Sequence, residues 1–325
     1  MSNVWSPQPI PHTDPRGGLP SRVRVYEVGP RDGLQAEAAT VPVEIKAEFC
    51  RRLVAAGVTD LELTSFVSPK WVPQLADAEE LMRRVVSDPA TALPESVRTV
   101  VLAPNQRGLD RALACGATEI AVFVSATETF AQRNLNTTIA GALRSAEPVI
   151  AGARAAGLPV RAYISMAFGD PWEGPVRLDA VVAVAERLRE LGCASLSIGD
   201  TIGVATPGHV HALIDALSTA GVPTSALAMH FHDTYGQALT NVYAALTADI
   251  IEFDSAAGGL GRCPYAKGAT GNLATEDLVW MLHGLGIATG IDLHALASTS
   301  RWIADHVGHP CPSRVVTALA AAGRD

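Results

Sequence analysis

Short apolar runs alternate along the chain with longer segments in which apolar residues recur about every 3.6 positions. The short runs predict strands at residues 22–28, 58–63, 97–102, 119–124, 160–165, 195–199, 226–231 and 250–253. The longer segments predict helices, of which the clearest cover residues 43–56, 178–191 and 207–220. A glycine follows several helical segments, where a helix C-terminus favours positive φ. These glycines are Gly57, Gly116, Gly157, Gly192 and Gly221.

Eight alternations of strand and helix predict an α/β fold with either a closed parallel barrel or a large open sheet. The count of eight favours a (β/α)8 TIM barrel. No Gly-rich dinucleotide fingerprint follows the first strand, which argues against the open sheet. We therefore expect a short flexible N-terminal arm at residues 1–20, a barrel at 21–290 and a C-terminal helical extension at 291–325.

The composition fits a globular protein with a large core. The 325 residues are 48% hydrophobic and 18% charged. The net charge of −8 makes a nucleic-acid partner unexpected, because an acidic surface repels phosphate backbones. Apolar runs are interrupted before they reach the length of a membrane span. The N-terminal arm lacks a secretory pattern and the five scattered cysteines form no C-x-x-C pair, so we expect a cytoplasmic protein.

Polar residues that could carry chemistry fall at or just after the C-terminal ends of predicted strands, where barrel enzymes place their active sites. They are Arg31 and Asp32 after the first strand, Glu62 on the second, Tyr163 on the fifth, Asp200 and Thr201 after the sixth, His230 and His232 at the seventh, and Cys263 and Asn272 after the eighth.

His230 and His232 are the most informative pair. Residues two apart on a strand face the same side, so both imidazoles are expected to point into the barrel mouth. With the carboxylate of Asp32 and the amide oxygen of Asn272, they form a set suited to Mg²⁺, Mn²⁺, Co²⁺ or Zn²⁺. Its oxygen content favours Mg²⁺ or Mn²⁺. The alternative is a pair of hydrogen-bonded core histidines that bind no metal.

Three further side chains have both a chemical and a structural interpretation. Arg31 could stabilise a developing oxyanion beside a metal, or it could only form a salt bridge. Glu62 is better suited to orienting Arg31 or a histidine than to direct chemistry. Cys263 lies in a Gly-rich segment, so it could deliver a proton from a mobile loop or be inert.

Five segments of the chain are distinctive when they are taken together. They read GPRDGLQ, TSFVSPKW, GDTIGVATPG, HFHDTYGQAL and GLGRCPYAKGATGNLATEDL. Together they closely resemble the 3-hydroxy-3-methylglutaryl-CoA lyase family, over nearly the whole predicted barrel. The RDGxQ segment alone is shared with a wider metallolyase superfamily that also holds isopropylmalate and homocitrate synthases. The cysteine loop and SFVSPKW are more specific to the lyase.

The resemblance implies a divalent-metal-dependent lyase that cleaves 3-hydroxy-3-methylglutaryl-CoA to acetyl-CoA and acetoacetate, in leucine or ketone-body metabolism. It implies an acyl-CoA partner and a homodimer. The implied metal ligands are Asp32, His230, His232 and Asn272. The resemblance implies that Arg31 stabilises the enolate and that Cys263 transfers a proton. It implies that Asp32 or a metal-bound histidine such as His230 abstracts a proton. Glu62 and Asp200 are implied to support the site. The implied substrate contacts are Tyr163, Thr201, Gln35 and Ser65.

The chain departs from the family pattern in two places. Arg262 precedes Cys263 where relatives usually have glycine, and one loop carries larger residues than many relatives, namely Met166, Phe168, Asp170 and Trp172. These differences leave open a lyase for a related 3-hydroxy-3-substituted acyl-CoA. The superfamily also leaves open a synthase that joins an acyl-CoA to a 2-oxo acid.

Two other functions are less favoured by the residues. A catalytically silent barrel that serves as a binding partner would have no need of the complete set Arg31, Asp32, His230, His232 and Asn272. A metal-dependent hydrolase is also disfavoured, because hydrolase barrels with an H-x-H pair usually carry that pair on the first strand.

Overall fold

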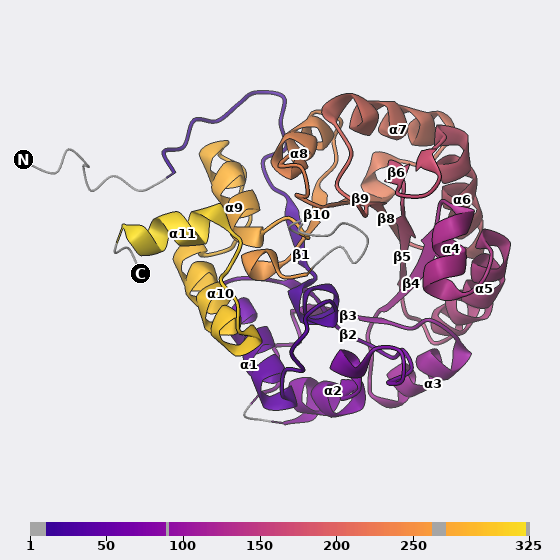
Figure 1. Ribbon diagram of the computed structural model, residues 1–325, viewed down its shortest axis with the longest axis horizontal. Helices are drawn as coiled ribbons and strands as arrows, with labels where there is room; N and C mark the ends of the chain where they lie inside the picture. Colours follow the sequence, from indigo (N-terminus) through magenta and orange to yellow (C-terminus); the bar gives the residue numbers. More distant parts are fainter. Residues whose placement is uncertain (1–10, 89–90, 262–270, 323–325) are drawn as a thin grey trace, which may run out of the picture.

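The structure is a computed structural model that describes residues 11–88, 91–261 and 271–322. Within these residues, eight parallel strands close into a barrel (Figure 1). The strands are β1 (Arg24–Glu27), β2 (Asp60–Ser65), β3 (Arg98–Leu102), β4 (Ile120–Ser125), β5 (Val160–Ser165), β8 (Ser195–Asp200), β9 (Leu227–Phe231) and β10 (Glu252–Ser255). Their order is β1-β10-β9-β8-β5-β4-β3-β2, and β2 pairs with β1 to close the ring. The predicted barrel is confirmed, and the open sheet is excluded.

Helices surround the barrel on its outer side (Figure 1). They are α1 (Val43–Ala55), α2 (Ala78–Ser87), α3 (Gln106–Ala114), α4 (Glu128–Leu135), α5 (Ile139–Ala155), α6 (Leu178–Leu191), α7 (Pro207–Thr219), α8 (Ala238–Thr247), α9 (Thr275–Gly284), α10 (Leu293–Val307) and α11 (Arg314–Ala321). The five glycines that were expected to cap helices all have positive φ.

The connections also contain short elements without a hydrophobic period. Helical turns lie at η1 (Gly29–Gly33), η2 (Pro73–Leu75), η3 (Thr224–Ala226) and η4 (Ala257–Gly259). Strands β6 (Gly169–Asp170) and β7 (Gly174–Pro175) form a small antiparallel hairpin in the loop after β5. Of these, η1 and η4 matter most for function, because they follow β1 and β10 at the C-terminal end of the barrel.

The last described helices, α10 and α11, lie on the outside of the barrel (Figure 1). Helix α10 packs against α1, α9 and α11, and the Asp292 amide donates to the Ala56 carbonyl at 2.8 Å. Near the other end of the chain, the Asp14 amide donates to the Gly284 carbonyl at the end of α9. Division of the chain at residues 20 and 290 stays a prediction.

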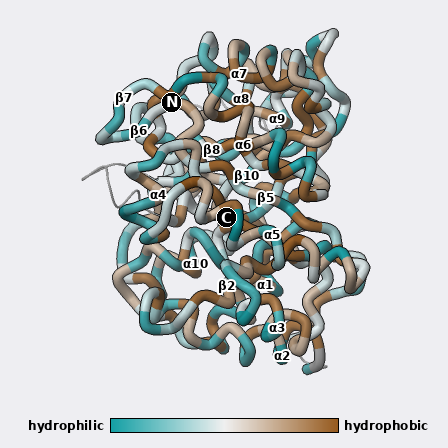
Figure 2. The backbone as a smooth tube through the Cα atoms, turned by 90° about the vertical axis from the view of Figure 1, so that its right-hand side faces the viewer, coloured by the Kyte–Doolittle hydropathy of each residue, from teal (hydrophilic) through white to brown (hydrophobic). Residues whose placement is uncertain are grey.

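The barrel strands are buried on both faces, because helices cover the sheet from outside and side chains fill it from inside. Strands β4 and β9 are therefore largely apolar, whereas β1, β2 and β10 also bury the acids Glu27, Glu62 and Asp254. Hydrophobic and hydrophilic stretches alternate along the outer helices (Figure 2). Among the described residues, none of the helices combines the length and apolar character that a bilayer span requires.

Candidate active site and metal centre

The candidate site begins at η1, the tight turn that follows β1. The Val28 carbonyl accepts amide hydrogen bonds from Arg31, Asp32 and Gly33, at 3.2, 2.8 and 3.1 Å. A side chain at Gly33 would place its Cβ 2.8 Å from that of Leu260, so only glycine lets the turn lie this close to the segment after β10. The turn holds Arg31 buried and Asp32 half-buried at the barrel mouth.

Three of the predicted metal ligands converge at this mouth. Each of Asp32, His230 and His232 offers one ligand atom, and these atoms lie within 4.8 Å of one another. The ring centroids of the two histidines are 5.3 Å apart; His230 is on β9, and His232 directly follows the last residue of that strand. Carboxylate and imidazole groups at such separations can share one cation.

Asn272 joins the same cluster. Its backbone forms a bridge with His232, and its side-chain nitrogen donates to Asp32 Oδ2 at 2.9 Å and to the Leu260 carbonyl at 3.0 Å. Its Oδ1 is buried and has no hydrogen-bond partner among the described residues. An unpartnered buried oxygen beside a carboxylate and two imidazoles suits a cation ligand, because an unpaired polar atom is otherwise costly to bury.

The protonation states also fit a metal site. Burial and the neighbouring His230 lower the pKa of His232 to about 3, so this imidazole is neutral, and its buried Nδ1 has no partner among the described residues. Burial alone would raise the pKa of Asp32, but the charges of Arg31 and His230 lower it to about 2. A neutral imidazole and an ionised carboxylate are the forms that bind metal ions.

Arg31 connects this cluster to Glu62. Its Nε donates to Glu62 Oε2 at 2.7 Å, and its other side donates to Asp32 Oδ1 at 2.7 Å. The Tyr163 hydroxyl also donates to Glu62 Oε2, at 2.9 Å. Burial raises the pKa of Glu62 while the Arg31 guanidinium opposes that rise. Glu62 therefore holds Arg31 and Tyr163 in place.

The remaining predicted site residues have mainly local contacts. Asp200 accepts the Val204 and Ala205 amides on its two oxygens, at 2.9 and 3.0 Å, and burial raises its pKa to about 6. Thr201 accepts the Met166 amide at 2.8 Å. Ser65 is buried and accepts the Val67 amide at 3.2 Å, whereas Gln35 is half-buried beside η1. Their proposed contacts with a substrate stay predictions.

Cys263 and Arg262 lie outside the described residues, so their roles also stay predictions. The segment just before them is held by buried acids. Glu27 Oε1 accepts the Ala257 amide at 2.9 Å, and Glu276 accepts the Gly258 amide at 3.0 Å.

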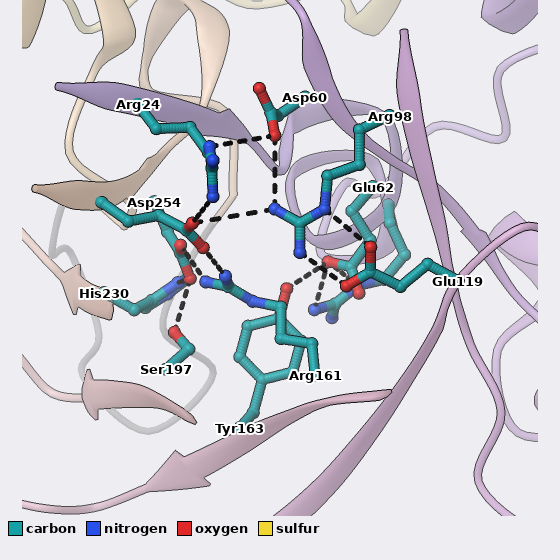
Figure 3. A network of polar contacts seen from close by, with 12 residues as sticks. Arg24, Asp60, Glu62, Arg98, Glu119, Arg161, Tyr163, Ser197, His230 and Asp254 are labelled. Atoms are coloured by element: carbon teal, nitrogen blue, oxygen red, sulfur yellow. Dashed lines mark hydrogen bonds and ion pairs between the residues drawn. The ribbon is translucent and has the colours of Figure 1, made fainter. Parts of the chain in front are cut away.

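Three buried polar residues of the site were not among those predicted (Figure 3). Asp254 on β10 faces His230, with Oδ2 3.2 Å from Nδ1. Ser197 donates to the same oxygen at 2.6 Å, and Arg161 forms an ion pair with Oδ1. A charged residue inside an otherwise apolar strand is a signal that could have identified Arg161. Asp254 lies just past the strand predicted at residues 250–253, and its partners become clear only when the barrel closes.

The fold and the site define a (β/α)8 barrel with a candidate divalent-metal centre at its mouth. A family model described as HMGL-like matches residues 22–303, and the chain belongs to this family. The chain is 47% identical over 301 residues to the cytoplasmic 3-hydroxy-3-methylglutaryl-CoA lyase of Rattus norvegicus, covering 93% of this chain and 86% of the relative.

A bacterial relative and a bacterial crystal structure are similar to the chain to the same degree. The chain is 47% identical over 303 residues to the 3-hydroxy-3-isohexenylglutaryl-CoA/hydroxy-methylglutaryl-CoA lyase of Pseudomonas aeruginosa, covering 93% of this chain and 99% of the relative. The crystal structure of a hydroxymethylglutaryl-CoA lyase from Pseudomonas aeruginosa superposes with a TM-score of 0.89 and 46% identity, covering 94% of this chain and 99% of that one.

Proposed function

We propose that the protein is a divalent-metal-dependent carbon–carbon lyase that cleaves 3-hydroxy-3-methylglutaryl-CoA to acetyl-CoA and acetoacetate. The convergence of Asp32, His230 and His232 within 4.8 Å carries the proposal. Family membership and the names of the relatives support the substrate. The metal is proposed to be Mg²⁺ or Mn²⁺, because Asp32 and Asn272 add oxygen ligands to the two imidazoles.

Each side chain of the site is proposed to have a separate role in the cleavage. A bound divalent cation would supply Lewis acidity that makes the tertiary hydroxyl of the substrate easier to deprotonate. Asp32 or one of the two histidines is the candidate base for that proton. Cleavage toward the thioester leaves an enolate, and the Arg31 guanidinium stabilises its negative oxygen. Cys263 is proposed to protonate the enolate carbon.

A broader acyl-CoA substrate is the second candidate. The Pseudomonas aeruginosa relative is named for both an isohexenyl and a methyl substrate. In this chain Met166 has positive φ and packs with Phe130 and Ile202, while Trp172 is 38% exposed on the β6–β7 hairpin. We propose that these larger residues of the loop after β5 determine whether a longer substituent is accepted. A panel of 3-substituted acyl-CoA thioesters, ranked by kcat/KM, tests this.

Product analysis with 3-hydroxy-3-methylglutaryl-CoA tests the main proposal. We expect acetyl-CoA and acetoacetate with Mg²⁺ or Mn²⁺, loss of activity with EDTA, and recovery when metal is added back. Full activity of the metal-stripped protein would contradict the proposal. Incubation with acetyl-CoA and a 2-oxo acid tests the synthase alternative, for which condensation without cleavage is the expected result.

The cellular setting is proposed from the relatives. We propose a homodimer that acts in leucine degradation. We propose a cytoplasmic location because the Rattus norvegicus relative described above is named as cytoplasmic, although other relatives are named as mitochondrial. Light scattering of the purified protein tests the dimer. A mass near the 34.0 kDa of one chain would contradict it.

A further inference from the structure

A network of buried charges crosses the barrel beneath the candidate metal centre (Figure 3). Arg161 on β5 is fully buried and forms ion pairs with Glu252 and Asp254, both on β10. Strands β8 and β9 lie between β5 and β10 in the ring, so Arg161 reaches across the interior. It also lies over the Tyr26 ring at 4.1 Å. This packing fixes the guanidinium, and the guanidinium in turn fixes Asp254.

Both carboxylate oxygens of Asp254 face groups that can donate hydrogen bonds. Oδ1 faces Arg161, which is always protonated. Oδ2 accepts the Ser197 hydroxyl at 2.6 Å and lies 3.2 Å from His230 Nδ1. A carboxylate that is ion-paired with a guanidinium carries no proton of its own. His230 must therefore supply the proton of the Nδ1 contact, which leaves the lone pair on Nε2.

We infer that Asp254, held by Arg161, is a positioning residue that fixes His230 in the tautomer whose Nε2 is free to bind a cation. The inference rests on the proposed metal centre and assigns to it a residue outside the ligand set. The other histidine differs, because His232 Nδ1 has no hydrogen-bond partner among the described residues. A carboxylate behind a ligating imidazole orients the ring and increases its basicity.

Asp254→Asn distinguishes control of the His230 tautomer from a role in packing alone. The amide has the same shape as the carboxylate, but one of its two ends donates hydrogen bonds where the carboxylate accepts them. Arg161 can only donate, so it would retain the amide oxygen. The NH2 group would then face His230 and Ser197. His230 would have to accept at Nδ1 and carry its proton on Nε2, where the cation should bind.

Mn²⁺ binding to the full-length, metal-stripped protein, measured by calorimetry, tests the inference. We expect Asp254→Asn to weaken Mn²⁺ binding about 10- to 100-fold, the usual effect of losing such a partner. Glu252→Gln is the matched control, since it removes the other carboxylate that pairs with Arg161 but does not contact His230; it should bind Mn²⁺ as the wild type does. Equal affinity of Asp254→Asn and wild type would overturn the inference.

A second measurement reads the tautomer of His230 directly in the wild-type protein. NMR of the ¹⁵N-histidine-labelled wild-type protein at alkaline pH reports which ring nitrogen of His230 carries the proton, with the signal assigned from His230→Gln. A proton on Nδ1 supports the inference, and a proton on Nε2 overturns it. If the wild-type protein itself binds no Mn²⁺, the proposed metal-dependent function fails, whatever tautomer His230 has.

Discussion

At the residue scale, Arg31 links two carboxylates that do different work. Its guanidinium donates to Glu62 through Nε and to Asp32 through its far side. This planar fork keeps Asp32 ionised next to the histidines. A lysine in this position has a single charged nitrogen and could not reproduce both contacts in the same geometry.

We predict that Arg31→Gln lowers kcat by roughly 10² to 10³, because one preorganised charge-stabilising group is lost. Steady-state kinetics with 3-hydroxy-3-methylglutaryl-CoA measures the change, and circular dichroism checks that the variant folds. Arg177→Gln is the control, since Arg177 is exposed and pairs only with neighbouring Asp179 in the described contacts. An unchanged kcat in Arg31→Gln would remove Arg31 from the proposed chemistry.

Much of the candidate site could be predicted from the sequence, because its ligands follow strand ends and the rule for barrels places strand ends together. His230 and His232 were found from their two-residue spacing together with their place at the predicted end of the seventh strand. The role of Asp254 could not be found in this way. Its partners Arg161, Ser197 and His230 come from three other strands, and which side chains meet inside a barrel depends on its register and closure.

At the element scale, the clearest helices were predicted because an apolar period near 3.6 continues over many residues, and the eight strands because short apolar runs alternate with the helical segments. The first and last residues of the elements were predicted less accurately. The second strand was expected at residues 58–63 and lies at Asp60–Ser65, because both flanks are apolar. The β6–β7 hairpin was missed because two strands of two residues each contain no period at all.

Gly57 lies between α1 and β2, where the backbone passes close to Gly290. Its φ is +98°, and an added Cβ would lie 2.2 Å from the Gly290 carbonyl oxygen. We predict that Gly57→Ala lowers the free energy of unfolding by about 3 kcal/mol, because backbone and not a flexible side chain stands in the way. Urea unfolding followed by circular dichroism measures this difference.

Gly157→Ala is the matched control for that variant. Gly157 follows α5 with φ +77°, and a Cβ added there would meet no other atom within 4 Å. This variant has the left-handed backbone strain without the collision, so we expect a loss of about 1 kcal/mol. Equal losses in the two variants would show that the contact with Gly290 has no energetic effect.

At the scale of the whole molecule, buried charged residues fall into two groups, those that form ion pairs and those that only accept hydrogen bonds. Those beneath the candidate metal centre form a chain: Asp254, in hydrogen-bond contact with His230, pairs with Arg161, Arg161 pairs with Glu252, and Glu252 pairs with Arg24. By contrast, Glu27 and Glu276 form no ion pair among the described residues. They hold the start of the segment after β10 through backbone amides and hydroxyl groups, with Thr275 donating to Glu27 at 2.6 Å.

These two acids predict how stability depends on pH. Burial raises the pKa of Glu27 to about 7 and that of Glu276 to about 8. In the unfolded chain both titrate near 4.5, so between these values the folded protein holds the extra protons. The stabilisation of the folded state by these extra protons is complete below about pH 4.5 and is lost as the pH rises through 7 to 8. The free energy of unfolding should therefore fall between pH 4.5 and pH 8.

Glu27→Gln tests this dependence, because a glutamine keeps the neutral form at every pH. Relative to the wild type, the variant should gain up to roughly 3 kcal/mol of stability between pH 5 and pH 9, since one pKa unit corresponds to about 1.4 kcal/mol. Urea unfolding at both pH values, with EDTA present, measures the gain. Glu186→Gln, an exposed glutamate on α6, controls for the loss of one surface charge. A difference between Glu27→Gln and wild type that stays the same at both pH values would mean that Glu27 is already ionised in the folded protein, with its backbone amide donors outweighing its burial.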